Sequence, residues 1–297
     1  MRTAIVTDSN SGMSQKQAEA LHCSVLPMPF SIDGTTYFED ITLSEDEFYQ
    51  KLLTDAEIFT SQPTPGDVMG LWDRLLETYD DIVYIPMSSG LSSSTSTAIM
   101  LSGDYKGKVY VVDNQRISVT QLQAVLHARQ LADEGKSAEE IASVLMAEKM
   151  DSSIYIMVDT LKYLKKGGRL TPAVAAIGTL LRIKPVLQIQ GEKLDTYKQA
   201  RTLKQAKQIM IQAIQKDIET RFGGNPDDCH ISIAHTMNLE AAKEFREELM
   251  EVFPGHDHIY IDHLSLSVSC HIGPGALAVT VTKKNGCSWD GTMPFER

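Results

Sequence analysis

The sequence predicts an α/β protein of two domains, an N-terminal layered domain with a mostly parallel sheet and a C-terminal domain with a mixed sheet. In the first half, apolar runs of strand length alternate with helical patterns; the second half adds a predicted hairpin to this alternation. The 297 residues suffice for two domains that each bury a core. We place the boundary after residue 152, which gives domains over residues 1–152 and 153–297.

The strands expected in the first half are almost continuously apolar, as is typical of strands covered on both faces. They span Thr3–Thr7, Ser24–Phe30, Asp81–Met87, Lys108–Val112 and Ser152–Val158. Helical patterns lie between them at Ser14–Leu21, Ser44–Leu53, Ser118–Glu134 and Ser137–Glu148. A further helix is expected to begin after Thr64, a good N-cap that is followed by Pro65.

The second half predicts a hairpin, with strands Pro185–Gln190 and Lys193–Tyr197 on either side of Gly191-Glu192. The elements expected after it are helix Leu203–Arg221, strand His230–His235, helix Leu239–Phe253 and strands His258–Asp262 and Ala276–Thr282. The tail from Lys283 to Arg297 continues past the last strand, and disorder of this segment is one expectation.

The composition excludes several classes of protein. A net charge of −11 argues against sequence-independent binding of nucleic acid, which needs a cationic surface. No apolar run approaches the roughly 20 residues of a membrane span, and the N-terminus resembles a first strand more than a signal peptide. We therefore expect a cytoplasmic protein without stable membrane insertion. The four cysteines show no paired spacing, which favours free thiols over disulfides or a zinc site.

Motifs for common cofactors and reactions are absent from the sequence. It contains no P-loop, no G-x-G-x-x-G fingerprint and no G-x-S-x-G elbow. An aspartate-nucleophile phosphatase requires a second acid two residues after Asp8, where Asn10 stands. The cluster His256-Asp257-His258 with Asp262-His263 has the residue types of a metal site, but a polar loop entering a strand explains it better. We predict no metal.

Polar clusters follow two of the predicted strands or precede helices. Asp8-Ser9 ends the first strand, Thr60-Ser61-Gln62-Pro63 precedes the Thr64 helix, and Ser88-Ser89-Gly90-Leu91-Ser92-Ser93 leads from a strand into a helix. The carboxyl ends of parallel strands form the usual ligand crevice, and a helix N-terminus with hydroxyls suits an anionic group. Simple helix capping remains an alternative for each cluster. His271 stands before the rigid turn Gly273-Pro274-Gly275, placed either to bond a serine or carboxylate or to serve as a structural histidine.

Six segments in order resemble the DegV family along nearly the whole chain. They are Thr7-Asp8-Ser9, Thr60-Ser61-Gln62-Pro63, Ser89-Gly90-Leu91-Ser92, Asp159–Leu170 with its Lys165-Lys166-Gly167-Gly168-Arg169 core, Ile183-Lys184-Pro185-Val186-Leu187, and His271-x-Gly-Pro-Gly. The resemblance implies a two-domain α/β protein that binds a long-chain fatty acid such as palmitate, stearate or oleate at the domain interface. It implies no catalytic activity of its own and no cofactor. The partner it implies is a separate ATP-dependent fatty-acid kinase, which converts the carboxylate to an acyl phosphate.

The resemblance also assigns roles to individual residues. Thr60 and Ser92 match the residues that hold the fatty-acid carboxylate, and both can donate a hydrogen bond to it. The supporting polar network it implies consists of Ser9, Ser93 and His271, and Arg169 matches an arginine that docks the kinase. The sequence departs from the family pattern after Ser92, where Ser93-Ser94-Thr95-Ser96-Thr97 makes the helix start more polar, and after Ser9, where Asn10-Ser11-Gly12 follows.

A buried acyl chain requires an apolar tunnel. The candidate lining residues are Met28, Phe30, Ile177, Leu180, Leu181 and Ile183, and the run Ala173–Leu181 is expected to form a covering helix. Ordinary core packing is the alternative for each of them.

Two other functions compete with fatty-acid binding. The first is a hydrolase or phosphotransferase that uses Asp8, Ser92 and His271, and it requires an orienting acid and an oxyanion hole. The second is a regulatory DNA-binding protein, which the acidic charge and the absence of a recognition-helix motif disfavour.

Overall fold

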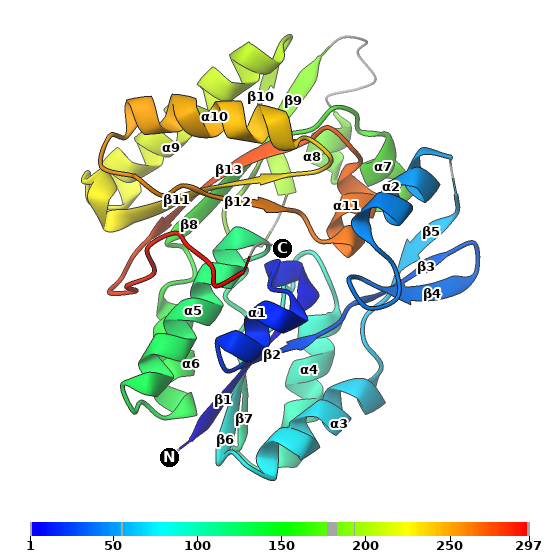
Figure 1. The fold of residues 1–297 in the computed structure, drawn as a ribbon, viewed down its shortest axis with the longest axis vertical. Coiled ribbons are helices and arrows are strands. Elements are labelled where there is room, and N and C mark those ends of the chain that lie inside the picture. Colours follow the sequence, from blue (N-terminus) through cyan, green and yellow to red (C-terminus); the bar gives the residue numbers. More distant parts are fainter. Residues whose placement is uncertain (1, 55, 177–182, 193, 296–297) are drawn as a thin grey trace.

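The computed structural model describes residues 2–54, 56–176, 183–192 and 194–295, and it confirms the α/β fold (Figure 1). A four-stranded parallel sheet lies in the first half of the chain and a six-stranded mixed sheet in the second, with a small three-stranded sheet beside them. The domain boundary after residue 152 stays a prediction, although the first strand of the mixed sheet begins at Ser152.

Helices cover both faces of the parallel sheet. Its strands in spatial order are β2 (Cys23–Leu26), β1 (Thr3–Asp8), β6 (Asp81–Ile85) and β7 (Val109–Val111). One face packs on α3 (Pro65–Leu76) and α4 (Ser94–Ser102), the other on α1 (Gln15–Ala20), α5 (Val119–Asp133) and α6 (Ala138–Ala147). Along β1, Ala4 and Val6 belong to the core under α3 and α4, whereas Ile5 belongs to the core under α1, α5 and α6. This strand is therefore apolar on both faces, as the sequence predicts.

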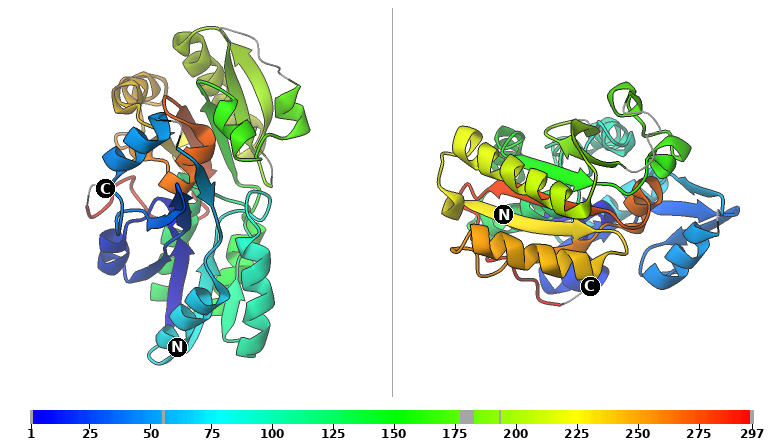
Figure 2. Two further views of the ribbon diagram at one scale, coloured as in Figure 1. Left: turned by 90° about the vertical axis from the view of Figure 1, so that its right-hand side faces the viewer. Right: turned by 90° about the horizontal axis from the view of Figure 1, so that it is seen from above.

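The mixed sheet is covered differently on its two faces. Its strands in order are β10 (Leu194–Ala200), β9 (Lys184–Ile189), β8 (Ser152–Met157), β13 (Leu277–Lys283), β11 (Cys229–His235) and β12 (Tyr260–His263), and the β11–β12 pair alone is parallel in this described sheet. Helices α9 (Leu203–Arg221) and α10 (Leu239–Val252) cover the outer face (Figure 2). The inner face is turned toward the parallel sheet and contacts α5.

The three-stranded sheet was not predicted. It consists of β4 (Thr35–Phe38), β3 (Pro29–Ile32) and β5 (Ile58–Thr60), and it packs against α2 (Glu45–Leu53) and α11 (Leu266–Ile272). Its hairpin turns at Asp33-Gly34, where φ is 48° and 83°, as in the tight turn that an Asp-Gly pair favours. The expectation of one strand over 24–30 is therefore wrong. Pro27 lacks a backbone N–H, and the chain leaves the parallel sheet there and enters the small one.

The remaining helices are short. They are α7 (Lys162–Lys166), α8 (Pro172–Ala175) and the single turns η1 (Ser9–Ser11), η2 (Gly103–Tyr105) and η3 (Pro226–Asp228). The helix expected over 173–181 begins as α8, and residues 177–182 lie outside the described part of the chain.

The described part of the C-terminal tail, residues 284–295, packs against the rest of the protein, where disorder was one expectation. The Phe295 carbonyl accepts a hydrogen bond of 2.7 Å from Gln17, and the Ser288 amide donates one of 2.8 Å to Gln130. Cys287 is buried, and the Trp289 ring packs on Tyr260. The tail thus returns across α1 and α5 and covers apolar groups that would otherwise face water.

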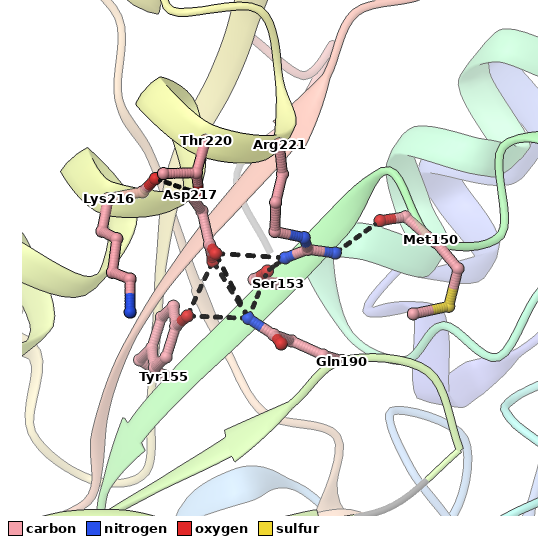
Figure 3. A network of polar contacts seen from close by, with 8 residues as sticks. All are labelled: Met150, Ser153, Tyr155, Gln190, Lys216, Asp217, Thr220 and Arg221. Atoms are coloured by element: carbon pink, nitrogen blue, oxygen red, sulfur yellow. Dashed lines mark hydrogen bonds and ion pairs between the residues drawn. The ribbon is translucent and has the colours of Figure 1, made fainter.

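A buried polar network holds the C-terminal end of α9 on the mixed sheet (Figure 3). The Asp217 carboxylate accepts hydrogen bonds from Tyr155 Oη at 2.7 Å and Gln190 Nε2 at 3.1 Å, and it pairs with Arg221 at 3.2 Å. Arg221 also donates to Ser153 and to the Met150 carbonyl. Because the buried charges are paired and hydrogen-bonded, the network fixes the helix without leaving an uncompensated ion. Burial and Asp217 together raise the pKa of Tyr155.

The β9–β10 hairpin contacts the loop that follows β6. The Ser88 hydroxyl donates to the Glu192 carbonyl at 3.5 Å, and a Cβ atom at Gly90 would overlap with that same carbonyl. Only a glycine lets the two backbones approach this closely.

We predict that Gly90→Ala destabilises the protein by about 1–3 kcal/mol, because the new methyl group forces the hairpin away from the loop. Gly103→Ala is the matched control: a Cβ there meets no atom within 4 Å, and the change should stay within about 0.5 kcal/mol. Urea denaturation of both variants measures the difference. Equal stability of the two would contradict the close packing at Gly90.

Candidate functional site

A cavity of about 240 Å³ lies between the inner face of the mixed sheet and the carboxyl ends of the parallel strands. Its inner wall is largely apolar and includes Ile154 and Ile156 of β8 and Ala278 of β13. The exposed lining residues Ser61, Ser93 and Arg169 mark its mouth. The cavity therefore combines an apolar interior with a polar entrance.

Thr60 and His271 meet at this mouth. Thr60 ends β5, His271 lies in the last turn of α11, and the Thr60 Oγ1 and His271 Nε2 atoms are 2.9 Å apart. The hydrogen bond joins residues 211 positions apart in the sequence. This hydrogen bond brings the two predicted site residues, Thr60 and His271, into one polar cluster, while their roles toward a ligand stay predictions.

Ser92 lies in the turn that leads from β6 into α4. Its amide donates to the Ser88 carbonyl at 3.1 Å, and its Oγ accepts from the Ser94 amide at 3.2 Å. Ser93 donates to the Gln62 side chain at 3.3 Å, which also accepts from Thr97 at 3.1 Å. Gln62 therefore ties the segment after Thr60 to the start of α4, where the positive end of the helix faces the cavity.

His271 is neutral near pH 7. Removal from water, helped by the charge of Arg169, lowers its pKa from 6.5 to about 4. Its Nδ1 atom is buried without a hydrogen-bond partner among the described residues. A Cβ atom at Gly167 would overlap with Nδ1, so a glycine at that position allows the imidazole to lie against α7.

Arg169 lines the cavity and is exposed at its mouth. Its Nη1 donates to the Gly167 carbonyl at 2.8 Å, and its charge lies near enough to His271 to help lower the pKa of that histidine. The neighbouring exposed side chains Lys162, Lys165 and Lys166 extend the positive charge along α7. This arrangement gives an acidic protein one basic rim.

Ser9 lies behind the cavity wall. Its Oγ accepts a hydrogen bond of 3.0 Å from the amide of Met28, a lining residue, and Ser9 itself does not appear in the described lining. Ser9 thus supports the backbone of the wall.

The residues of the competing catalytic hypothesis are not linked to one another. The buried Asp8 carboxylate accepts from the Met87 amide at 2.8 Å, the Asn10 amide at 3.0 Å and Gln121 at 3.2 Å, and burial raises its pKa. His271 bonds Thr60, whereas Ser92 bonds Ser94. Within the described residues no hydrogen bond connects Asp8, Ser92 and His271 into a relay, so the geometry gives no support to a triad.

Sequence reasoning missed Asn10 and α11 as parts of the site. Asn10 lines the cavity and its Oδ1 accepts from Ser265 at 3.0 Å and Ser267 at 2.5 Å, which ties the end of β1 to the start of α11. The sequence feature that could have indicated Asn10 is its position in Asn10-Ser11-Gly12, where the chain departs from the family pattern after Ser9. The stretch 266–272 carried no clear helical pattern, because its serines alternate with apolar residues.

The predicted tunnel residues separate into three groups. Met28 lines the cavity, and Ile183 packs on the apolar cluster that forms its wall. Phe30 instead belongs to the core under α2. Ile177, Leu180 and Leu181 lie outside the described residues.

Two further features bear on the earlier expectations. Among the residues that the structure describes, no three His, Cys, Asp or Glu side chains gather as a metal site would require. None of the described helices is long and apolar enough to cross a membrane.

The buried histidines predict a pH-dependent stability. Burial lowers the pKa of His230, His235 and His271 from 6.5 to about 4, so the unfolded chain takes up protons in this range before the folded protein does. The free energy of unfolding should therefore fall as the pH decreases from about 6.5 to about 4. Urea denaturation across this range measures the slope, and His235→Gln should make it shallower. If His235→Gln shows the same slope as the parent protein, burial of His235 is not a source of the pH dependence.

Comparisons with known proteins agree with this architecture. A family model described as "Uncharacterised protein, DegV family" matches residues 2–284. The protein DegV of Bacillus subtilis is 30% identical over 282 residues, which cover 94% of this chain and 98% of that protein.

Solved structures show the same fold. A structure described as fatty acid binding of a DegV family protein from Thermus thermophilus superposes with a TM-score of 0.87 at 28% identity, covering 95% of this chain and 100% of the other. The structure of DegV, a fatty acid binding protein from Bacillus subtilis, superposes with a TM-score of 0.84 at 29% identity, covering 96% and 100%. With a family model over nearly all of its length and a cavity at the junction of its two main sheets, the chain belongs to the DegV family.

Proposed function

We propose that the protein binds a long-chain fatty acid, with the carboxylate at the mouth of the cavity and the acyl chain inside it. The observation that carries the proposal is the cavity itself, which has largely apolar walls and a cluster of hydroxyl groups at its mouth. Burial of the chain contributes about 0.8 kcal/mol per methylene. The solved structures of the DegV proteins from Thermus thermophilus and Bacillus subtilis, whose descriptions name fatty acid binding, support it.

Thr60 and Ser92 would hold the carboxylate. The unpartnered Nδ1 of His271 favours the tautomer with the proton on Nε2, because a buried lone pair costs less than a buried N–H. Nε2 then donates to Thr60 Oγ1, and the Thr60 hydroxyl is left to donate outward to the ligand. The neutral His271 thus orients Thr60 without adding a charge, while Arg169 supplies positive charge nearby.

The bound acid would then be presented to a separate ATP-dependent kinase. That enzyme transfers the γ-phosphoryl group of ATP to a carboxylate oxygen, which yields an acyl phosphate and ADP. A carboxylate at the mouth lies beside Arg169 and the lysines of α7, and this basic rim suits an acidic surface of the partner. The protein itself would act as a carrier without catalytic activity.

We predict that Thr60→Val and Ser92→Ala each weaken binding of oleate by about ten- to a hundredfold, because each removes one hydrogen bond to a charged group. Ser102→Ala is the control, since that hydroxyl bonds the Ile99 carbonyl in α4 and does not line the described cavity. Titration of a fluorescent fatty acid, displaced by oleate, gives the dissociation constants. Unchanged affinity in both variants would place the carboxylate elsewhere.

We also predict that Arg169→Ala slows acyl-phosphate formation by the kinase roughly tenfold, through loss of electrostatic docking. The exposed Arg201, which lies outside the described cavity lining, supplies the control Arg201→Ala. Fatty-acid affinity measured in the same samples separates weaker docking from weaker binding. If Arg169→Ala is phosphorylated as fast as the parent protein when the fatty-acid-bound protein is below the concentration that saturates the kinase, Arg169 does not dock the kinase.

A further inference from the structure

Two buried hydroxyl groups of the cavity make no hydrogen bond within the described part of the chain. Ser118 and Thr280 both line the cavity and are only 4% and 1% exposed. Neither Oγ atom has a hydrogen-bond partner among the described residues. Buried hydroxyls are normally hydrogen-bonded, and leaving one unpaired is costly, so these two are available to a polar group that enters the cavity.

The side chain of Thr280 is on the cavity side of β13. Along this strand Leu277, Val279 and Val281 belong to the core under α9, whereas Ala278 and Thr280 lie on the opposite face. Thr280 pairs directly with Ile154 of β8, another lining residue, and directly paired residues share a face.

Thr280 also lies away from the mouth. Strand β13 begins at Leu277, a few residues after α11 and its His271, and Thr280 is about 10 Å further along the strand at roughly 3.4 Å per residue. The polar mouth and Thr280 are thus separated by the apolar wall around Ala278 and Ile156, which pair with each other.

Ser118 occupies the N-cap position of α5 but does not cap the helix with its side chain. A serine at this position ordinarily accepts a hydrogen bond from the first turn. Here φ is 55°, and the Ser118 amide instead donates to the Asn10 carbonyl at 2.9 Å, at the carboxyl end of the parallel sheet. Its hydroxyl remains available in the cavity wall.

We propose that Ser118 and Thr280 form a second polar subsite, which selects fatty acids that carry a hydroxyl group in the distal half of the acyl chain. This inference rests on the proposed function. Each residue can donate a hydrogen bond to a ligand hydroxyl or accept one from it, because serine and threonine hydroxyls do both. An unsubstituted chain leaves both protein hydroxyls unpaired and binds less favourably.

The test compares octadecanoic acid with its positional hydroxy isomers in four proteins: the parent chain, Thr280→Val, Ser118→Ala and the control Thr282→Val. Thr282 lies on the same face of β13 and is 2% exposed, and its hydroxyl also has no described partner, but it does not appear in the described cavity lining. Competition with a fluorescent fatty acid gives each affinity, and thermal unfolding verifies that each variant is folded.

For each protein, the measured quantity is the ratio of its affinity for a hydroxy isomer to its affinity for octadecanoic acid. For at least one distal isomer, this ratio should be about three- to tenfold higher in the parent chain and in Thr282→Val than in Thr280→Val. Ser118→Ala should reduce the same ratio and keeps the test decisive if Thr280→Val fails to fold. If the ratio is equal in all four proteins, the subsite does not exist, although the proposed function stands. If Thr280→Val strengthens both acids alike, the hydroxyls hold only water and the inference is overturned. Failure of the parent chain to bind any of the acids would reject the proposed function itself.

Discussion

The buried carboxylate of Asp8 fixes the edge on which the site is built. It accepts hydrogen bonds from the backbone amides of Met87 and Asn10 and from the side chain of Gln121, and it therefore joins the ends of β1 and β6 to α5. A carboxyl group removed from water needs such donors, and the buried backbone N–H groups that follow the two strands need such an acceptor. With this edge fixed, the loops that follow each strand leave it in defined directions toward the mixed sheet.

The cavity follows from how these loops meet the second sheet. Asn10 reaches Ser265 and Ser267 at the start of α11, Gln62 joins the segment after Thr60 to α4, and Thr60 bonds His271. These contacts are polar, whereas Ile154, Ile156 and Ala278 on the inner face of the mixed sheet give the cavity a largely apolar wall. The same residues that join the sheets thereby create a hollow with a polar entrance, the shape that an amphipathic ligand requires.

The sequence predicted most strands and helices, because their apolar patterns have a clear period of two or 3.6 residues. It failed where local chemistry overrides the pattern: Pro27 divides one predicted strand between two sheets, and the Asp33-Gly34 turn creates a sheet of short, partly polar strands. Thr60, Ser92, Ser93, His271 and Arg169 were found through family motifs, and the structure places all five around one cavity. Asn10 and Thr280 were missed as lining residues, since their place in the cavity arises from contacts between distant segments that no local pattern contains.

The central claim is that this cavity holds a fatty acid, and native mass spectrometry of the purified protein tests it most directly. The account predicts a mass that exceeds the chain by one fatty acid, which denaturing extraction releases and identifies. A protein that has the mass of the bare chain, and keeps that mass after incubation with stearate or oleate, would contradict the account.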